Sequence, residues 1–309
     1  MSQFSFNLSD FVFVWWGLLY EALPFVALGS LVSGILECWV SRETVTRLFP
    51  RSRGAGIAVG AALGLVMPMC ECAVVPIVRR LMLKGVPIPC GIAFLLASPI
   101  VNPLVIASTF MAFRGQNMWE VVALRVGLGY LVAVLVATAV GKIWGDSGEH
   151  VLRSSQPRGH EHSAAGTRSG LSQVLAVAAS EFIVIGGTLA LGGAVAALIN
   201  SGFSRQSMMP LASDPRIAVP SMMGLAIALN LCSEADAFVG ASFYAFPLAA
   251  KMAFLVLGPM VDIKLILVYW AVFRPKATIT ILGLTTILVW LLCMTMPTWL
   301  PIVNGSWLR

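Results

Sequence analysis

The sequence predicts an all-α polytopic membrane protein, with about eight helical membrane segments in two homologous halves. The first reason is composition: 58% of the 309 residues are hydrophobic and only 11% are charged, whereas soluble domains carry roughly 25% charged residues. The second reason is that apolar runs of about 20 residues, enough to cross a bilayer, recur along the whole chain. The third reason is that the second half repeats the pattern of the first.

Eight apolar segments follow one another along the chain. They cover residues 11–38, 54–80, 86–113, 119–144, 171–199, 217–243, 246–273 and 276–300. No Lys or Arg precedes the first segment, so it lacks the basic start of a signal peptide and we expect it to be retained. Trp119 and Trp144 flank the fourth segment, as residues of an interfacial aromatic belt do. We expect a first transmembrane half at 1–145, a polar linker at 146–170 and a second transmembrane half at 171–309.

The two halves match at a constant offset. The stretch AFLLASPIVNPLVI starts at Ala93 and AFLVLGPMVDIKLI starts at Ala253, so the offset is 253 − 93 = 160 residues. Over 64–108 the ungapped alignment gives 10 identities in 45 positions, and the shared residues include Gly, Cys and Pro. Internal repeats with interrupted helices are typical of secondary transporters.

The positions of Lys and Arg favour a re-entrant hairpin in each half. If all eight segments cross the membrane, nine basic residues fall on each side. If 54–84 and 217–246 enter and return instead, thirteen basic residues share one side and five the other, which is the bias of the positive-inside rule. Each half then has three full crossings, so the second half is inverted, with the N-terminus outside and the 146–170 linker in the cytoplasm. A broken helix that crosses fully is the alternative.

The first candidate site lies in MCECAVVPIVRRLMLKG, which begins at Met69. On a continuous helix Cys70 and Cys72 would point about 200° apart, whereas in an extended segment they share a side. Pro68 and Pro76 disfavour helix on either side, so we expect a break where the two thiols converge. An unpaired Glu71 at membrane depth would be costly. The alternative is that both cysteines pack as small apolar residues.

The second candidate site is the matching stretch NLCSEADAF, residues 230–238. It brings five polar or thiol side chains into an apolar run, namely Asn230, Cys232, Ser233, Glu234 and Asp236. We expect these residues to form the second half of one substrate site near the bilayer midplane. The alternative is a helix cap or a solvated loop near the outer surface.

Two further matched pairs of polar residues are candidates. Asn102 and Asp262 each follow a shared proline by three residues, so they either line the substrate path or cap broken helix ends. Glu21 and Glu181 lie early in matched segments, where they either carry protons or make structural hydrogen bonds between helices.

The residue types suggest a class of substrate. Three thiols with carboxylates suit a soft or borderline cation, since thiolate prefers Cu(I), Zn and related species, whereas Ca and Mg prefer oxygen. We expect Cys70, Cys72 and Cys232 to bind a small inorganic or organometallic substrate, and we expect no cofactor. His160 and His162 form a weaker candidate metal site. The net charge of +6 follows from basic loops facing the cytoplasm, so no nucleic acid is needed to explain it.

Three stretches carry a family resemblance: MCECAVVPIVRRLMLKGVP, AFLLASPIVNPLVIAST and CSEADAFVGASF. At these residues the chain resembles the bacterial predicted-permease family that includes the organoarsenical efflux permeases (ArsP-like, YraQ-type). The resemblance implies an inner-membrane permease in the lipid bilayer. In the arsenical exporters of this family, membrane cysteines handle trivalent arsenic, a role that would fall on Cys70, Cys72 and Cys232. The double CEC and the acidic SEAD depart from those exporters, so the substrate of this branch is unassigned.

Other classes of protein fit the sequence less well. It contains no Gly-x-x-x-x-Gly-Lys-Ser/Thr motif, so we expect coupling to an ion gradient or to a separate partner protein. It also lacks His-Glu-x-x-His and Gly-x-Ser-x-Gly, and all three histidines lie in or beside the linker, so we expect no enzyme. The remaining alternatives are a membrane metal sensor or scaffold and a permease for an unrelated small solute.

Overall fold

The computed structural model describes residues 8–48, 50, 52–67, 69–145, 151–152, 170–200 and 215–299. These residues are almost entirely helical, and their one bridge of strand type pairs Leu152 with Phe273. In chain order the helices are α1 (Leu8–Trp39), α2 (Arg42–Leu48), α3 (Arg53–Ala62), η1 (Leu63–Leu65), α4 (Glu71–Leu83), α5 (Ile88–Val101), α6 (Pro103–Ala112), α7 (Met118–Trp144), α8 (Gly170–Asn200), α9 (Pro215–Leu229), α10 (Ser233–Ser242), α11 (Leu248–Leu257), α12 (Ile263–Val272) and α13 (Pro275–Trp299).

The helix bounds follow the 160-residue offset found in the sequence. Helix α6 starts at Pro103 and ends at Ala112, and α12 starts at Ile263 and ends at Val272, so both bounds differ by 160 residues. Helices α5 and α11 also begin 160 residues apart. Among the described residues, each half runs from a long helix through a short helix (α3 or α9), a break, a second short helix, a buried helix and another break to two final helices, and the first half has the additional elements α2 and η1.

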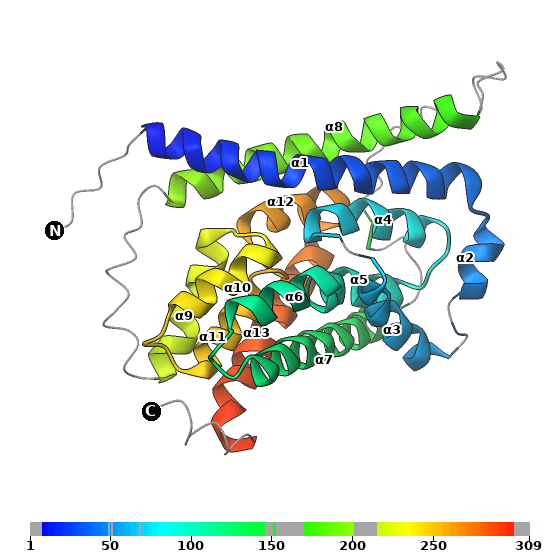
Figure 1. The fold of residues 1–309 in the computed structure, drawn as a ribbon. Helices are drawn as coiled ribbons and strands as arrows, with labels where there is room; N and C mark the ends of the chain where they lie inside the picture. Colours follow the sequence, from blue (N-terminus) through cyan, green and yellow to red (C-terminus); the bar gives the residue numbers. More distant parts are fainter. Residues whose placement is uncertain are drawn as a thin grey trace.

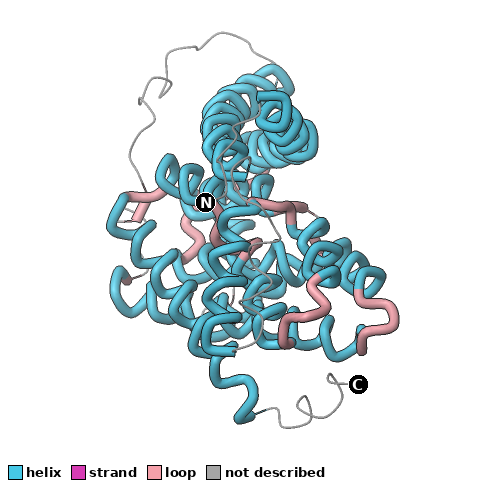
Figure 2. The backbone as a smooth tube through the Cα atoms, turned by 90° about the vertical axis from the view of Figure 1, so that its left-hand side faces the viewer, coloured by secondary structure: helices cyan, strands magenta, loops and turns pink. Residues whose placement is uncertain are grey.

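The long helices α1 and α8 form an antiparallel pair along one side of the other helices (Figures 1 and 2). Trp15 near the start of α1 donates from Nε1 to the carbonyl of Ala190 near the end of α8, at 2.9 Å. Gly34 near the end of α1 lies against the backbone of Val174 near the start of α8. Much of the outer surface of this pair is apolar and exposed, as lipid contact requires.

The pair contacts the two halves differently. Helix α1 packs along α4 and α8 packs along α12, whereas α1 with α6 and α8 with α10 share at most marginal contact. Glycine permits the close approach at Gly29, since a Cβ there would lie 2.5 Å from the Ala73 carbonyl oxygen. Gly192 similarly lies against the backbone of Lys264. Small residues at helix crossings allow backbones to approach in this way.

Two fully buried helices form the centre of the molecule. All 14 residues of α5 are buried, and so are all 10 residues of α11. Helix α5 packs against α3, α4 and α7, and α11 packs against α9, α10 and α13. This explains why both sequences are apolar on every face rather than amphipathic.

Five helical stretches are long and apolar enough to cross a membrane: Leu8–Trp39, Ile88–Ala112, Met118–Trp144, Gly170–Leu198 and Pro275–Met296. The chain is therefore a multi-pass membrane protein. Of the eight expected segments, 54–80, 86–113, 217–243 and 246–273 are divided into shorter helices. A 10-residue helix such as α11 is only about 15 Å long. The re-entrant course of 54–84 and 217–246 stays a prediction.

The expected linker at 146–170 lies mostly outside the described residues, as do Pro68, His160 and His162. Two of its residues, Val151 and Leu152, are described and buried. The backbone N–H of Arg274 donates to the carbonyl of Val151 at 2.8 Å. The start of the linker is thus anchored where α12 meets α13.

Candidate functional site

The helix breaks give the site its frame. At the first break, the chain leaves the helical path after η1, and Cys70 has extended backbone (φ −72°, ψ 168°) immediately before α4. At the second break, Asn230 has φ +54°, a left-handed conformation that asparagine tolerates better than most residues. Cys232 is then extended (φ −74°, ψ 152°) before α10. An extended cysteine therefore immediately precedes the helix that follows each break.

The structure corrects two details of the expected first break. Only Cys70 is extended, because α4 begins at Glu71 and includes Cys72 in its first turn. Helix α4 also continues through Pro76. Proline has no N–H to donate to the carbonyl four residues earlier, which here belongs to Cys72.

The matched polar residues Asn102 and Asp262 cap helices. Asn102 accepts a hydrogen bond from the N–H of Leu104 at 2.9 Å, and its amide donates to the carbonyl of Met69 at 3.0 Å. Asp262 accepts from the N–H of Leu265 at 2.6 Å. Both side chains thus satisfy helix-start N–H groups, and Asn102 also ties α6 to the first break. Their contribution to a substrate path stays a prediction.

A buried lysine joins the two breaks. The Nζ atom of Lys264 lies 2.9 Å from Oε1 of Glu71 and 3.2 Å from Oδ2 of Asp262. It also donates to the carbonyl of Leu231 at 3.3 Å. The side chains of Lys264 and Glu71 are 3% and 1% exposed. Sequence reasoning noted Lys264 within a segment but gave it no role, although a lone charge inside an apolar segment is itself a signal.

The contacts continue from Glu71 to a second buried cation. Ser233 donates from Oγ to Oε2 of Glu71 at 2.7 Å. Arg125 donates from Nη2 to the carbonyl of Ser233 at 3.0 Å and from Nη1 to Oγ1 of Thr109 at 2.7 Å. We call Glu71, Thr109, Arg125, Ser233, Asp262 and Lys264 the central network. Its members come from α4, α6, α7, α10 and α12, so it connects the two halves.

Two acidic residues border the central network. Asp236 is 2% exposed and interacts electrostatically with Arg125. Among the described residues, its Oδ2 atom has no hydrogen-bond partner. Glu234 is half-buried in the same helix, α10. A buried polar atom without a hydrogen-bond partner is costly, so Oδ2 of Asp236 is the least satisfied atom described beside the Arg125 guanidinium.

Three thiols lie close to the central network. Cys70, Cys72 and Cys232 are 1%, 0% and 3% exposed, and all six cysteines of the chain are free. Cys70 and Cys72 lie close to each other, and Cys232 lies close to Lys264 and Glu71. No three His, Cys, Asp or Glu side chains within the described ranges have metal-binding geometry. Substrate binding by all three thiols stays a prediction.

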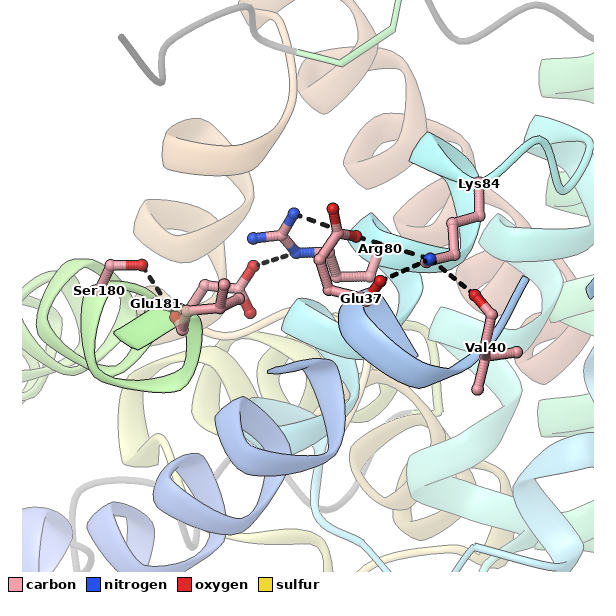
Figure 3. A network of polar contacts seen from close by, with 7 residues as sticks. Glu37, Val40, Arg80, Lys84, Ser180 and Glu181 are labelled. Carbon is pink, nitrogen blue, oxygen red and sulfur yellow. Dashed lines mark hydrogen bonds and ion pairs between the residues drawn. The ribbon is translucent and has the colours of Figure 1, made fainter. Parts of the chain in front are cut away.

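The matched glutamates Glu21 and Glu181 have different surroundings. Glu21 is exposed on α1, whereas Glu181 on α8 is 1% exposed. Glu181 accepts a hydrogen bond from Nε of Arg80 on α4 at 2.6 Å (Figure 3). Sequence reasoning missed Arg80 as a partner because the two residues are 101 positions apart.

The Arg80–Glu181 pair belongs to a second polar cluster, which we call the α1–α4–α8 cluster: Glu37, Val40, Arg80, Lys84 and Glu181 (Figure 3). Nη1 of Arg80 lies 3.5 Å from Oε2 of Glu37. Lys84 donates to the carbonyls of Glu37 at 3.0 Å and of Val40 at 2.8 Å. These contacts bind α4 to the end of α1 and to α8.

Comparisons with known proteins agree with this architecture. A family model described as "Predicted permease" (ArsP_1) matches residues 8–297. The chain belongs to this predicted-permease family. It is 36% identical over 290 residues to UPF0718 protein YcgR of Bacillus subtilis (strain 168), covering 93% of this chain and 96% of that protein. The resemblance stated from the sequence is thus confirmed.

Two other relatives extend the comparison. The chain is 35% identical over 280 residues to a protein of Streptococcus mutans named "Putative two-component membrane permease complex subunit", covering 90% of this chain and 91% of that protein. It is 25% identical over 133 residues to UPF0718 protein YraQ of Escherichia coli (strain K12), covering 43% of this chain and 36% of that protein. No solved structure matches the chain significantly. The family model and the Streptococcus mutans relative place it among predicted membrane permeases.

Proposed function

We propose that this permease is a secondary transporter that moves a soft or borderline cation, or a trivalent metalloid, across the inner membrane of the cell. The observation that carries the proposal is the position of Cys70, Cys72 and Cys232. They come from matched breaks in the two halves and are buried beside a charged network. Thiolate ligands select soft cations and metalloids over hard ones.

The other candidate residues have supporting parts in this proposal. Glu71, Glu234 and Asp236 supply negative charge to a bound cation, and Asn230 and Ser233 shape the second break. Asn102 and Asp262 hold the starts of α6 and α12 at the path. Glu181 and Glu21 are the proposed proton carriers. Each is buried in turn as the two halves move.

Alternating access follows from an inverted repeat. Helices α1 and α8 match at the 160-residue offset and run antiparallel, which supports inversion of the second half. In this structure α1 packs on α4 and α8 on α12. Exchanging the roles of the halves gives a second state in which α1 packs on α6 and α8 on α10. Movement of the long pair between these positions exposes the site to each side in turn.

The orientation and the partners also belong to the proposal. The positive-inside bias places the N-terminus outside and the 146–170 linker in the cytoplasm. One relative is named as a subunit of a two-component membrane permease complex, which supports a separate partner protein for this chain.

The test measures flux in proteoliposomes loaded with arsenite, a trivalent organoarsenical, Zn²⁺ or Cu⁺, together with accumulation in cells. Two test variants are used: the double variant Cys70→Ser with Cys72→Ser, and the single variant Cys232→Ser. The matched control is Cys90→Ser with Cys293→Ser, which removes two buried thiols outside the breaks. Flux of one substrate that is lost only in the break variants supports the proposal. Specific binding without flux would indicate a sensor or scaffold, and wild-type flux in the break variants would indicate an unrelated solute.

A further inference from the structure

The ammonium group of Lys264 is enclosed by oxygen atoms from three separate elements. Glu71 contributes a carboxylate oxygen from the first turn of α4, at 2.9 Å. Asp262 contributes a carboxylate oxygen from the residue that caps α12, at 3.2 Å. Leu231 contributes a backbone carbonyl from the non-helical residues between α9 and α10, at 3.3 Å. We call these three oxygens the oxygen cage.

The oxygen cage has the chemistry of a site for a free cation. Carboxylate and carbonyl oxygens are the donors that hard metal cations prefer. In transporters with broken helices, unwound backbone carbonyls and helix ends coordinate the coupling ion, and the Leu231 carbonyl lies in such an unwound segment. The cage holds two negative charges, both on side chains that are 1% exposed. Without a cation between them, these carboxylates would repel each other in a medium that screens charge poorly.

The position of Lys264 depends on contacts outside its own helix, α12. Its backbone N–H donates to Oδ1 of Asn230 at 3.1 Å, so the second break holds the start of α12 in place. The side chain then reaches across to the first break at Glu71. The residue matched to Lys264 in the first half is Leu104 (264 − 160 = 104), so only the second half supplies the lysine, whereas the oxygen cage takes atoms from both halves.

We propose that the oxygen cage is an alkali-metal cation site whose occupant in this state is the ammonium of Lys264. The chain thereby carries its own cation, and the wild-type protein needs no bound sodium or potassium to balance Glu71 and Asp262. When the Lys264 side chain is absent or displaced, a free monovalent cation takes its place. This inference goes beyond the thiol-based function, and it is tested by binding rather than by flux, so either proposal can fail alone.

The experiment compares purified full-length protein with its Lys264→Ala variant in detergent. Thermal unfolding is followed in sodium, potassium, lithium and methylammonium chloride, with choline chloride at equal ionic strength as the reference. We expect no cation-specific shift for the wild type. The variant should show a saturable rise of several degrees with at least one small cation, because a ligand that binds only the folded state stabilises it by mass action. Methylammonium tests the cage most directly, since it restores the missing ammonium.

Two variants serve as controls. Lys264→Ala combined with Glu71→Gln removes one carboxylate of the cage and should lose the cation response. Lys251→Ala removes another buried lysine, whose Nζ lies over the Tyr244 ring at 5.9 Å and is no part of the oxygen cage, and should show no response. Lys264→Ala protein that folds and behaves alike in all five salts overturns the proposal. Failure to fold in every salt also overturns it, because a cation site requires rescue by a free cation.

Discussion

The two halves of the molecule share one order of helices but differ in how they meet the long helix pair. In the first half α1 packs on the short helix α4, and in the second half α8 packs on α12. The matched glutamates show the consequence: Glu181 is buried against Arg80, whereas Glu21 is exposed. A repeat in sequence therefore does not give equal environments, because here α1 and α8 pack on helices that do not match each other.

The charged residues differ between the halves more than the frame does. At the 160-residue offset, Arg80 matches Gly240, Lys84 matches Tyr244, Arg125 matches Thr285 and Lys264 matches Leu104. By contrast, Cys72 matches Cys232, and Asn102 matches Asp262. Breaks, caps and thiols are thus repeated, whereas the cations are not. The difference indicates that the frame was duplicated and that the charged chemistry is specific to each half.

The largest expected effect comes from giving the first half a residue of the second. Gly29 matches Leu189 (29 + 160 = 189), and a Cβ at Gly29 would lie 2.5 Å from the Ala73 carbonyl oxygen. Gly29→Leu should therefore prevent α1 from packing on α4 and abolish the monodisperse peak in fluorescence size-exclusion chromatography. Gly17→Leu is the control, since nothing lies within 4 Å of a Cβ there. A normal peak for Gly29→Leu would contradict the α1–α4 contact.

The second prediction concerns the buried ion pair. Arg80→Met leaves the Glu181 carboxylate buried and unpaired, which should destabilise the protein by about 3–5 kcal/mol. Adding Glu181→Gln should restore most of that loss, because the remaining pair of neutral groups needs no counter-charge. Reversible denaturation in mixed micelles measures both. Glu21→Gln, the matched change in the first half, should stay within about 0.5 kcal/mol; equal costs for the two glutamates would remove the difference between the halves.

The third prediction makes the first break resemble the second. Asn102→Asp keeps an oxygen for the N–H of Leu104 but loses the donor to the Met69 carbonyl, which Asn102 now supplies at 3.0 Å. It also introduces a buried carboxylate beside Leu104, where the second half has Lys264. We expect a loss of about 1–3 kcal/mol in unfolding free energy. Combining Asn102→Asp with Leu104→Lys should recover part of it, and a double variant no better than the single one would argue against the pairing.

The smallest expected effect concerns the proposed second state, in which α1 packs on α6 and α8 on α10; we call it the exchanged state. Gly192 contacts Lys264 in this structure, and the exchanged pair is Val32 with Leu104 (192 − 160 = 32; 264 − 160 = 104). Val32→Cys with Leu104→Cys, in a Cys38→Ser background, should be joined by a short thiol cross-linker in a minority of molecules, about 0.1–10% at equilibrium. Arg80→Met should raise that fraction, because it removes a contact specific to the observed state. Complete absence of cross-linking in membranes with and without substrate would contradict the exchange.

Sequence reasoning recovered the frame of the site from local signals. Hydropathy identified the membrane class, and Asn102, Asn230 and Asp262 marked the helix starts and turns where the chain breaks. The double cysteine marked the first break, although α4 begins at Glu71, two residues earlier than an extended Cys70–Cys72 segment requires. These features depend on neighbours close in the chain, so a local pattern was sufficient to predict them.

The partners of the charged groups were not predictable in the same way. Arg125 and Lys264 were visible as charges inside apolar segments, yet nothing near them in sequence names Ser233 or Glu71 as their contacts. Nor does the sequence indicate that Glu181 is buried while Glu21 is exposed.

By itself, the sequence determined that this protein is a helical membrane permease with repeated halves, interrupted helices and thiols at matched breaks. The length of apolar segments, the helix-breaking residues and the cysteine positions are local properties of the sequence, so they do not depend on which helices meet in the folded protein. The tertiary structure decided that α1 packs on α4 and α8 on α12, that Glu181 rather than Glu21 has a charged partner, and that Lys264 reaches Glu71 across the breaks. Those outcomes depend on which helix faces meet in space, and the energy of a buried charge is fixed only when its neighbours are in place.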